Sequence, residues 1–175
     1  GNIGRPGAGL CPVRGHSNVQ GDRTMGINER PPVAFLDSLE RRFQFKVPRD
    51  NGHNVVEAIH AMLEGRAKVF IGLGGNFAQA TPDSTRTFEA LRNCDLTVQI
   101  STKLNRSHLM HGKDALILPC LGRTHIDIQT EGPQAVTVDD SFSMAHASNG
   151  QLQPLSNQMP SSPSILPGIA AAPLG

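Results

Sequence analysis

The sequence has few charged residues, no long apolar run and no closely spaced pair of cysteines. Only 18% of its 175 residues are charged and the net charge is +1. The basic patch typical of a nucleic-acid-binding surface is therefore absent, and we expect no nucleic-acid partner. No apolar run reaches the roughly 20 residues that a helix needs to cross a bilayer. We therefore expect no contact with a membrane.

The cysteine pattern excludes two kinds of structural site. Cys11, Cys94 and Cys120 show no CxxC spacing, so neither a zinc site nor a disulfide framework is expected. An odd number of cysteines leaves at least one thiol unpaired or bonded to another chain. Reduced thiols are typical of cytoplasmic proteins, and this is the location that we predict.

Glycine, proline and polar residues divide the chain into three segments. Residues 1–32 are loop-rich, begin with neither an initiator methionine nor a leader sequence, and are expected to flank an active site. Residues 33–122 carry the apolar periodicity and are predicted to form an α/β domain that holds the core. Residues 123–175 are predicted to be an irregular continuation, and 148–175 a loop or frayed tail.

The middle segment alternates between the helix period and the strand period. Strands are predicted at 67–71, 96–101 and 115–119, and a shorter strand at 135–138. We expect Gly65 to end one helix and Thr81 to cap the next, with Pro82 at its first position. This order predicts a Rossmann-like, open and mostly parallel sheet with helices on both faces. The predicted helices are 33–45, 54–64, 82–92 and a short one within 104–111.

Small or polar residues follow each predicted strand, and in a parallel sheet such carboxyl ends form a ligand crevice. Glycines after the first strand allow a ligand to approach the backbone N–H groups, and Lys103 after the second offers charge to a phosphate. The spacing G-x-G-G-N is not the dinucleotide fingerprint, so an ordinary NAD site is not expected. The alternative for the glycine segment is a plain connecting turn. For the residues after the second strand it is a solvated loop, and for Cys120 it is a buried packing role.

Arg14 and His16 are the candidate reactive side chains near the N-terminus. An arginine in a pocket can hold a carboxylate through two hydrogen bonds or stabilise developing negative charge, whereas the alternative is a surface arginine. His16 is a candidate proton carrier, with a structural histidine as the alternative. His108 and His111 have the spacing of a metal pair, but no third ligand is suitably spaced, so we expect no metal site in this chain.

Several strings resemble one protein family. The string GNIGRPGAGLCPVRGHSNVQGDRTMG, residues 1–26, resembles the signature G-N-x-G-x-P-x-A-G-x-x-P-x-R-G-x-x-N-V-Q-G of formate-dehydrogenase-like molybdopterin oxidoreductases. The strings GLGGNFAQATPD, STKLNRSH and ALILPCLGRT are similar to one branch of that group, some members of which are linked to acid resistance. The resemblance covers about residues 1–150, and the sequence departs from it beyond Met159.

The resemblance implies a longer catalytic chain that binds molybdenum through two molybdopterin guanine dinucleotides and commonly carries a [4Fe–4S] cluster. The α/β domain would hold one guanine dinucleotide. Asn76 matches an aspartate that contacts the nucleotide, Thr81 lies near a second contact, and Cys120 matches a serine contact. The full set of cofactor-binding residues that we predict is Gly74, Gly75, Asn76, Thr81, Ser101, Thr102, Lys103, Asn105 and Cys120.

By the same resemblance, Arg14 matches the arginine near the metal, and His16 and Ser17 replace a glutamine and an asparagine of formate dehydrogenases. The cluster cysteines and the metal ligand of the family lie upstream of this string. We therefore expect an interior fragment, inactive alone, whose partners are the rest of the catalytic subunit, a small-molecule substrate and an electron acceptor. The alternatives are a noncatalytic Rossmann-like mononucleotide-binding module and a truncated product that binds nothing.

Overall fold

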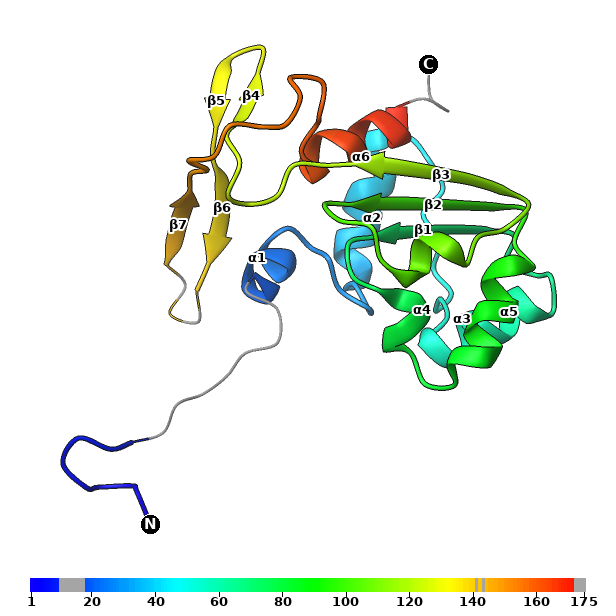
Figure 1. Ribbon diagram of the computed structural model, residues 1–175, viewed down its shortest axis with the longest axis horizontal. Coiled ribbons are helices and arrows are strands. Elements are labelled where there is room, and N and C mark those ends of the chain that lie inside the picture. The colour runs from blue at the N-terminus through cyan, green and yellow to red at the C-terminus, as the bar shows by residue number, and fades with distance from the viewer. Residues whose placement is uncertain (10–17, 141, 143, 172–175) are drawn as a thin grey trace. The chain divides into compact units, whose positions relative to one another are not determined.

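A computed structural model describes residues 1–9, 18–140, 142 and 144–171 (Figure 1). The chain divides into two compact units, residues 1–49 with 136–148 and residues 50–135 with 149–175. The three segments predicted from the sequence, 1–32, 33–122 and 123–175, have different boundaries from these two units. The division into three segments stays a prediction.

The larger unit is built on a three-stranded parallel sheet. Its strands are β1 (Val69–Leu73), β2 (Leu96–Ser101) and β3 (Asp114–Pro119), in the order β1-β2-β3. Ile71 of β1 lies opposite Val98 of the central strand β2. All the neighbouring strands in this sheet run parallel, which confirms the predicted Rossmann-like α/β class.

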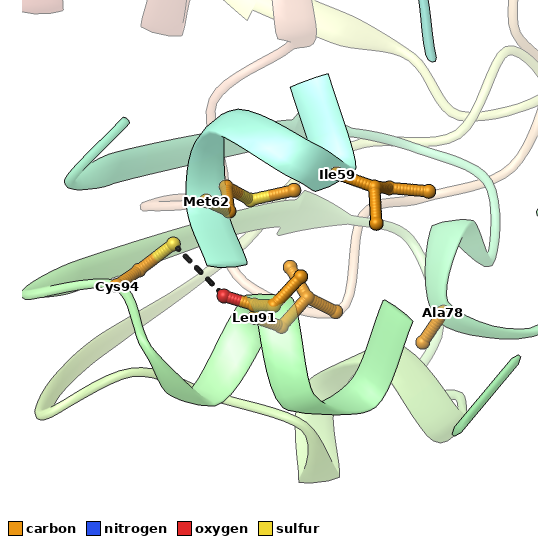
Figure 2. Close-up of a cluster of buried hydrophobic side chains, with 6 residues drawn as sticks. Ile59, Met62, Ala78, Leu91 and Cys94 are labelled. Carbon is orange, nitrogen blue, oxygen red and sulfur yellow. Dashed lines mark hydrogen bonds between the residues drawn. The ribbon is translucent and has the colours of Figure 1, made fainter. Parts of the chain in front are cut away.

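Three helices cover one face of this sheet: α3 (Val55–Leu63), α4 (Phe77–Ala80) and α5 (Ser84–Arg92). Phe70 of β1 packs against the buried cluster that they form. Burial also raises the pKa of the Cys94 thiol, because a thiolate is poorly solvated there. Figure 2 shows this cluster, whose buried members are Ile59, Met62, Ala78, Ala90, Leu91 and Cys94.

The opposite face packs against α6 (Ser162–Ala171). Side chains alternate along a strand, so Val98 and Ile100 point away from the face of Phe70. They form a second cluster with Cys120 and with Ile165 of α6. The expectation of a loop or tail at 148–175 is thus wrong for α6, and so is a core limited to residues 33–122. The prolines and serines of α6 weaken the helix signal in the sequence. One apolar side is nevertheless enough for the helix to pack against the sheet.

The ends of α3 follow from local chemistry. Asn54 Oδ1 accepts a hydrogen bond from Glu57 N at 3.0 Å, and Glu57 Oε2 accepts one from Asn54 N at 3.0 Å. This reciprocal capping box satisfies two backbone donors of the first turn. Gly65 follows the helix with φ of 70°, so the predicted glycine at its C-terminal end is confirmed.

The predicted cap of α5 is wrong. Asp83 caps this helix instead, and its Oδ1 accepts a hydrogen bond from Arg86 N at 3.2 Å. Thr81 ends the short helix α4, which the sequence analysis did not separate from α5. The helix α5 therefore starts two residues later than predicted, at Ser84, because Asp83 takes a left-handed φ of 54° before it.

Short elements complete the larger unit. The expected short helix within 104–111 is a 3₁₀ turn, η1 (Arg106–Leu109). Beyond β3, β4 (Asp127–Gln129) and β5 (Gly132–Gln134) form an antiparallel pair.

The smaller unit contains α1 (Val19–Thr24), α2 (Val33–Phe43) and the antiparallel pair β6 (Val136–Asp139) and β7 (Ala145–Ser148). Asn18 joins α1 to β6, because its Oδ1 accepts a hydrogen bond from the backbone N–H of Asp139 at 3.0 Å. The helix predicted at 33–45 and the strand predicted at 135–138 thus correspond to α2 and β6.

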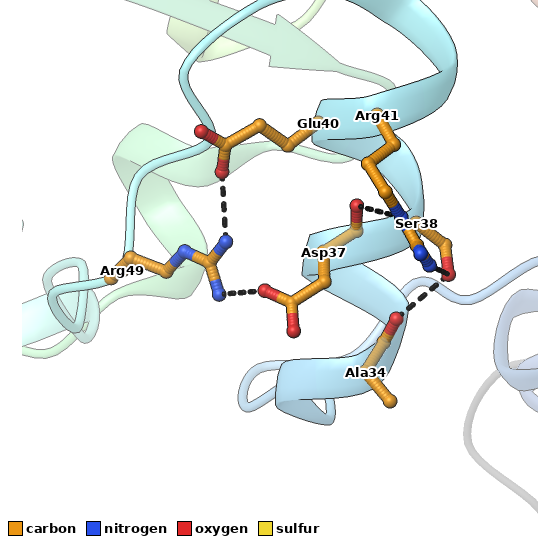
Figure 3. Close-up of polar contacts among 6 residues, drawn as sticks. All are labelled: Ala34, Asp37, Ser38, Glu40, Arg41 and Arg49. Atoms are coloured by element: carbon orange, nitrogen blue, oxygen red, sulfur yellow. Dashed lines mark hydrogen bonds and ion pairs between the residues drawn. The ribbon is translucent and has the colours of Figure 1, made fainter.

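A polar network ties the chain after α2 back to that helix (Figure 3). Arg49 lies 2.7 Å from Asp37 and 2.8 Å from Glu40, one turn apart on α2. These side chains are about half exposed to solvent, so the ion pairs contribute little to stability.

Candidate functional site

The backbone is held together just beyond the strand ends. We call residues 74–76, 101–108 and 120–122 the carboxyl edge. Gly74 N donates to Ile100 O at 2.7 Å, and Cys120 N donates to Ser101 O at 3.2 Å. Three chain segments far apart in sequence are thereby fixed side by side, as the sheet topology predicts.

The turn after β1 is open. Gly74 and Gly75 have φ values of 65° and 68°, a conformation that side-chain-bearing residues rarely adopt. A Cβ atom added to either glycine would meet no atom within 4 Å. The backbone N–H groups of Gly75 and Asn76 donate to no residue that the structure describes. Their geometry therefore allows another molecule to approach the main chain.

Ser107 is the centre of a polar network that holds this turn. Its hydroxyl accepts a hydrogen bond from Ala78 N at 2.9 Å and donates one to Asn76 Oδ1 at 3.0 Å. Its own backbone N–H also points to Asn76 Oδ1, at 3.3 Å. Ser107 is 1% exposed, so these bonds are shielded from water. Ser107 was not among the residues predicted from the sequence, because its partners lie about 30 positions away in the chain.

Asn105 ties the loop after β2 to the same turn. Its Nδ2 donates to Gly75 O at 2.6 Å, and its Oδ1 accepts a hydrogen bond from Ser107 N at 2.9 Å. His108 Nδ1 accepts from Asn105 N at 3.0 Å. The structure therefore brings Gly75, Asn76 and Asn105, all predicted from the sequence, into one network.

Ser101, Thr102 and Lys103 extend the carboxyl edge beyond β2. Ser101 Oγ donates to the carbonyl of Lys103 at 2.8 Å, which closes a small turn. A Cβ atom on Gly122 would lie 3.8 Å from the Thr102 methyl group, so the loops after β2 and β3 are neighbours. Lys103 is exposed and has no ion-pair partner in the part of the chain that the structure describes.

Thr81 and Cys120 have local partners. The Thr81 hydroxyl lies 2.8 Å from that of Thr87, a fully buried residue of α5. Cys120 is 3% exposed, and its Sγ lies 3.6 Å from the Ser162 hydroxyl of α6. Their contact with a cofactor stays a prediction.

Two buried nitrogen atoms near the carboxyl edge lack hydrogen-bond partners among the described residues: Gln99 Nε2 and His108 Nε2. Gln99 belongs to β2, and its Oε1 would lie 2.7 Å from a Cβ atom on Gly72 of β1. Its carboxamide therefore lies over Gly72, where a Cβ atom would force the end of the Gln99 side chain to move. A buried amide without a partner is costly. Gln99 was not among the site residues predicted from the sequence.

Arg14 and His16 lie outside the described residues, so their catalytic roles stay predictions. Among the described residues, no three or more His, Cys, Asp or Glu side chains gather as a metal site would require. His111 Nδ1 lies 2.8 Å from the carbonyl of Gly112, whereas His108 is bonded to Asn105. No helix within the described ranges has the length and apolarity to cross a membrane.

A surface hollow beside α2 is a weaker candidate site. Its lining includes the charged side chains of Asp37, Glu40 and Arg49, and these already pair with one another. The candidate site is therefore the carboxyl edge, where open backbone and polar groups without partners in the described part of the chain occur together.

The chain is similar over its whole length to proteins that are much longer. An uncharacterized oxidoreductase of Mycobacterium tuberculosis is 58% identical over 175 residues, which are all of this chain and 22% of that protein. Protein YdeP of Escherichia coli K12 is 51% identical over 174 residues, 99% of this chain and 23% of YdeP. YrhE of Bacillus subtilis, provisionally named a formate dehydrogenase, is 29% identical over 115 residues, 61% of this chain and 12% of YrhE.

No family model matches the chain. The chain spans less than a quarter of the length of the mycobacterial and E. coli relatives. The comparisons thus relate this sequence to one segment of larger proteins named as oxidoreductases, with a weaker likeness to formate-dehydrogenase-like proteins.

Proposed function

We propose that the chain is the nucleotide-holding part of a molybdopterin-dependent oxidoreductase and that its carboxyl edge binds one molybdopterin guanine dinucleotide. Two lines of similarity support the proposal. The N-terminal string GNIGRPGAGLCPVRGHSNVQGD resembles the molybdopterin oxidoreductase signature, and the longer relatives that match the whole chain include a protein named as an oxidoreductase.

The observation that carries the proposal is the open glycine pair at the carboxyl edge. A dinucleotide needs close backbone approach and N–H donors for its oxygen atoms. Gly74 and Gly75 leave space around the main chain, and the N–H groups of Gly75 and Asn76 are unbonded among the described residues. The residues present therefore fit a phosphate-containing group.

Each part of the edge would have a distinct role. Asn105 and Ser107 hold the turn in shape before any ligand arrives, which lowers the ordering cost of binding. Lys103 supplies the positive charge that a diphosphate requires. The bound molybdenum would supply two-electron oxidation–reduction chemistry. By resemblance, Arg14 would hold an anionic substrate near it and His16 would carry a proton.

Cofactor content tests the proposal directly. We would purify the protein that contains this sequence and measure molybdenum by mass spectrometry and GMP released by acid hydrolysis. We expect both, in a ratio of about two GMP per metal, because two guanine dinucleotides are proposed to bind one molybdenum. A protein that releases a mononucleotide but holds no molybdenum would instead be a noncatalytic nucleotide-binding module.

The isolated 175-residue chain is a second test of the same proposal. It should reduce no dye with formate as donor, because the family's metal ligand and cluster cysteines lie outside this sequence. Dye reduction above a protein-free control would contradict the assignment as a cofactor-holding part.

A further inference from the structure

The strand β1 is an outer strand of the parallel sheet, and the side chains on one of its faces are uncovered (Figure 1). Val69, Ile71 and Leu73, which we call the outer residues of β1, are between 49% and 55% exposed. They share a face with Val98, because Ile71 lies opposite Val98 in the sheet. The helix α6 packs on that face, but none of the described members of its cluster comes from β1. An apolar surface therefore continues outward from the α6 cluster.

The outer residues of β1 also direct their backbone groups away from the sheet. Lys68 O accepts a hydrogen bond from Leu96 N at 3.2 Å, and Gly74 N donates one to Ile100 O at 2.7 Å. In a parallel pair, every second residue of a strand bonds to one neighbour, and the residues between them face the other side. The even-numbered residues of β1 therefore bond to β2. The N–H and C=O groups of the outer residues face away from β2, and no strand in the described part of the chain pairs with them.

The other outer strand, β3, ends in a residue that opposes pairing. Cys120 N donates to Ser101 O at 3.2 Å, so by the same alternation Pro119 directs its nitrogen away from β2. Proline has no N–H to donate and is typical of strands that stay at the edge of a sheet. The outer residues of β1 include neither a proline nor a charged residue. The edge at β3 is therefore protected against pairing, and the edge at β1 is not.

The lengths of the relatives indicate where a partner for β1 would come from. The matched residues are 22% of the mycobacterial relative and 23% of YdeP, so most of each of those proteins lies outside the matched segment. Parallel sheets are usually covered on both faces. A row of unpaired backbone groups beside apolar side chains is the surface to which a further strand adds.

We propose that β1 is an interior strand in the full-length protein, and that an apolar β-strand from the same polypeptide, outside this sequence, pairs with its outer residues. That strand would form the hydrogen bonds that Val69, Ile71 and Leu73 leave unmade within the described part of the chain. Its apolar side chains would extend the face that α6 covers only in part. A second copy of the chain is the other partner that fits, and the experiment separates the two. The inference is independent of the cofactor proposed above.

Hydrogen exchange tests the pairing on the full-length protein that contains this sequence. We would measure amide exchange at single-residue resolution by mass spectrometry with electron-transfer fragmentation. The amides of the outer residues of β1 should exchange at least about a hundredfold more slowly than exposed loop amides, because a paired amide exchanges only when the structure opens. The amides of Phe70 and Gly72, which bond to β2, are the control for protection within the sheet.

Photochemical crosslinking identifies the partner. A diazirine amino acid in place of Ile71 would lie beside side chains of the added strand. The crosslinked peptide should come from outside the 175 residues of this sequence, in a product with the mass of one polypeptide chain. Ile117 is the matched control, because it is also an isoleucine of an outer strand and is 46% exposed. The same replacement there should not label that peptide.

Four results would overturn the inference. Exchange of the outer residues as fast as that of exposed loops would show that β1 remains an edge in the full-length protein. Crosslinks from position 71 only to peptides within residues 1–175 of the same chain would show that this sequence covers its own strand. Crosslinked products with the mass of two chains, and protection that falls on dilution, would identify a second copy as the partner. Labelling of the same peptide from positions 71 and 117 would show that the reaction does not report pairing.

Discussion

Substitution of Gly74 by valine separates a binding role of the β1 turn from a structural one. Gly74 has a left-handed φ of 65° and open space where a side chain would begin. A Cβ atom there meets nothing within 4 Å beyond the chain neighbours, so we expect the cost of valine to folding to be mainly backbone strain. Left-handed backbone costs an L-residue about 1–2 kcal/mol, and the free energy of unfolding should fall by about that amount.

The effect on nucleotide binding should be larger. The three carbon atoms of the valine side chain would occupy the space through which a ligand reaches the N–H groups of Gly75 and Asn76. We expect GDP affinity to fall by about a hundredfold, equivalent to roughly 2.7 kcal/mol, since ordinary single contacts contribute about 1–3 kcal/mol and this change blocks more than one. Urea unfolding and calorimetric titration would measure the two quantities on the protein that contains this sequence, produced in cells that cannot make the molybdenum cofactor.

Gly65→Val is the matched control for this prediction. Gly65 has nearly the same φ, 70°, and its nearest atom beyond the chain neighbours is Asn93 Nδ2, 4.0 Å from an added Cβ. Both variants should lose similar stability, but only the Gly74 variant should lose nucleotide affinity. A Gly74→Val protein that binds GDP like the wild type would show that the turn merely connects β1 to α4 and does not hold the nucleotide.

Two further predictions concern the core and the N-terminal segment. Leu91→Ala should lower the free energy of unfolding by about 2–5 kcal/mol, because Leu91 is fully buried between the helices and the sheet. Urea denaturation measures this change, and a loss below about 1 kcal/mol would contradict the packing described here. In the complete enzyme, Arg14→Ala should leave the molybdenum content unchanged and lower kcat/KM by about 10²–10³, with partial rescue by lysine, because a lost charge-stabilising contact typically costs about 2–4 kcal/mol. Unchanged kcat/KM at full metal content would make Arg14 a structural residue.

Much of the sheet and its helices could be predicted from local sequence. The alternation of Leu96, Val98 and Ile100 with polar residues indicates a strand, because a period of two is visible in any single strand. It does not reveal that Thr97 and Gln99, on the other side of β2, are buried as well. Gly65 could likewise be recognised, because a left-handed residue after a helix favours glycine whatever the rest of the fold does. The turn at Gly74 and Gly75 follows for the same reason.

Some local sequence features indicate the wrong helix boundaries. Thr81 and Pro82 have the residue types of a helix start, but α5 is capped by Asp83. Thr81 instead hydrogen-bonds to the buried Thr87, and that contact exists only once α5 has packed. The helix α6 was overlooked because its prolines and serines lower the local helix signal, whereas its stability comes from the packing of Ile165 and Ile169 against β2.

The parallel α/β pattern and the polar residues after each strand follow from the amino-acid sequence alone, because hydrophobic period and turn chemistry are local properties. How those polar residues face one another depends on the packing of the whole domain. Ser107 bonds to Asn76 across 31 positions of sequence, and Asn105 reaches Gly75 across 30. The shape of the edge depends on these contacts, because hydrogen bonds between residues so far apart in sequence form only when the strands have paired.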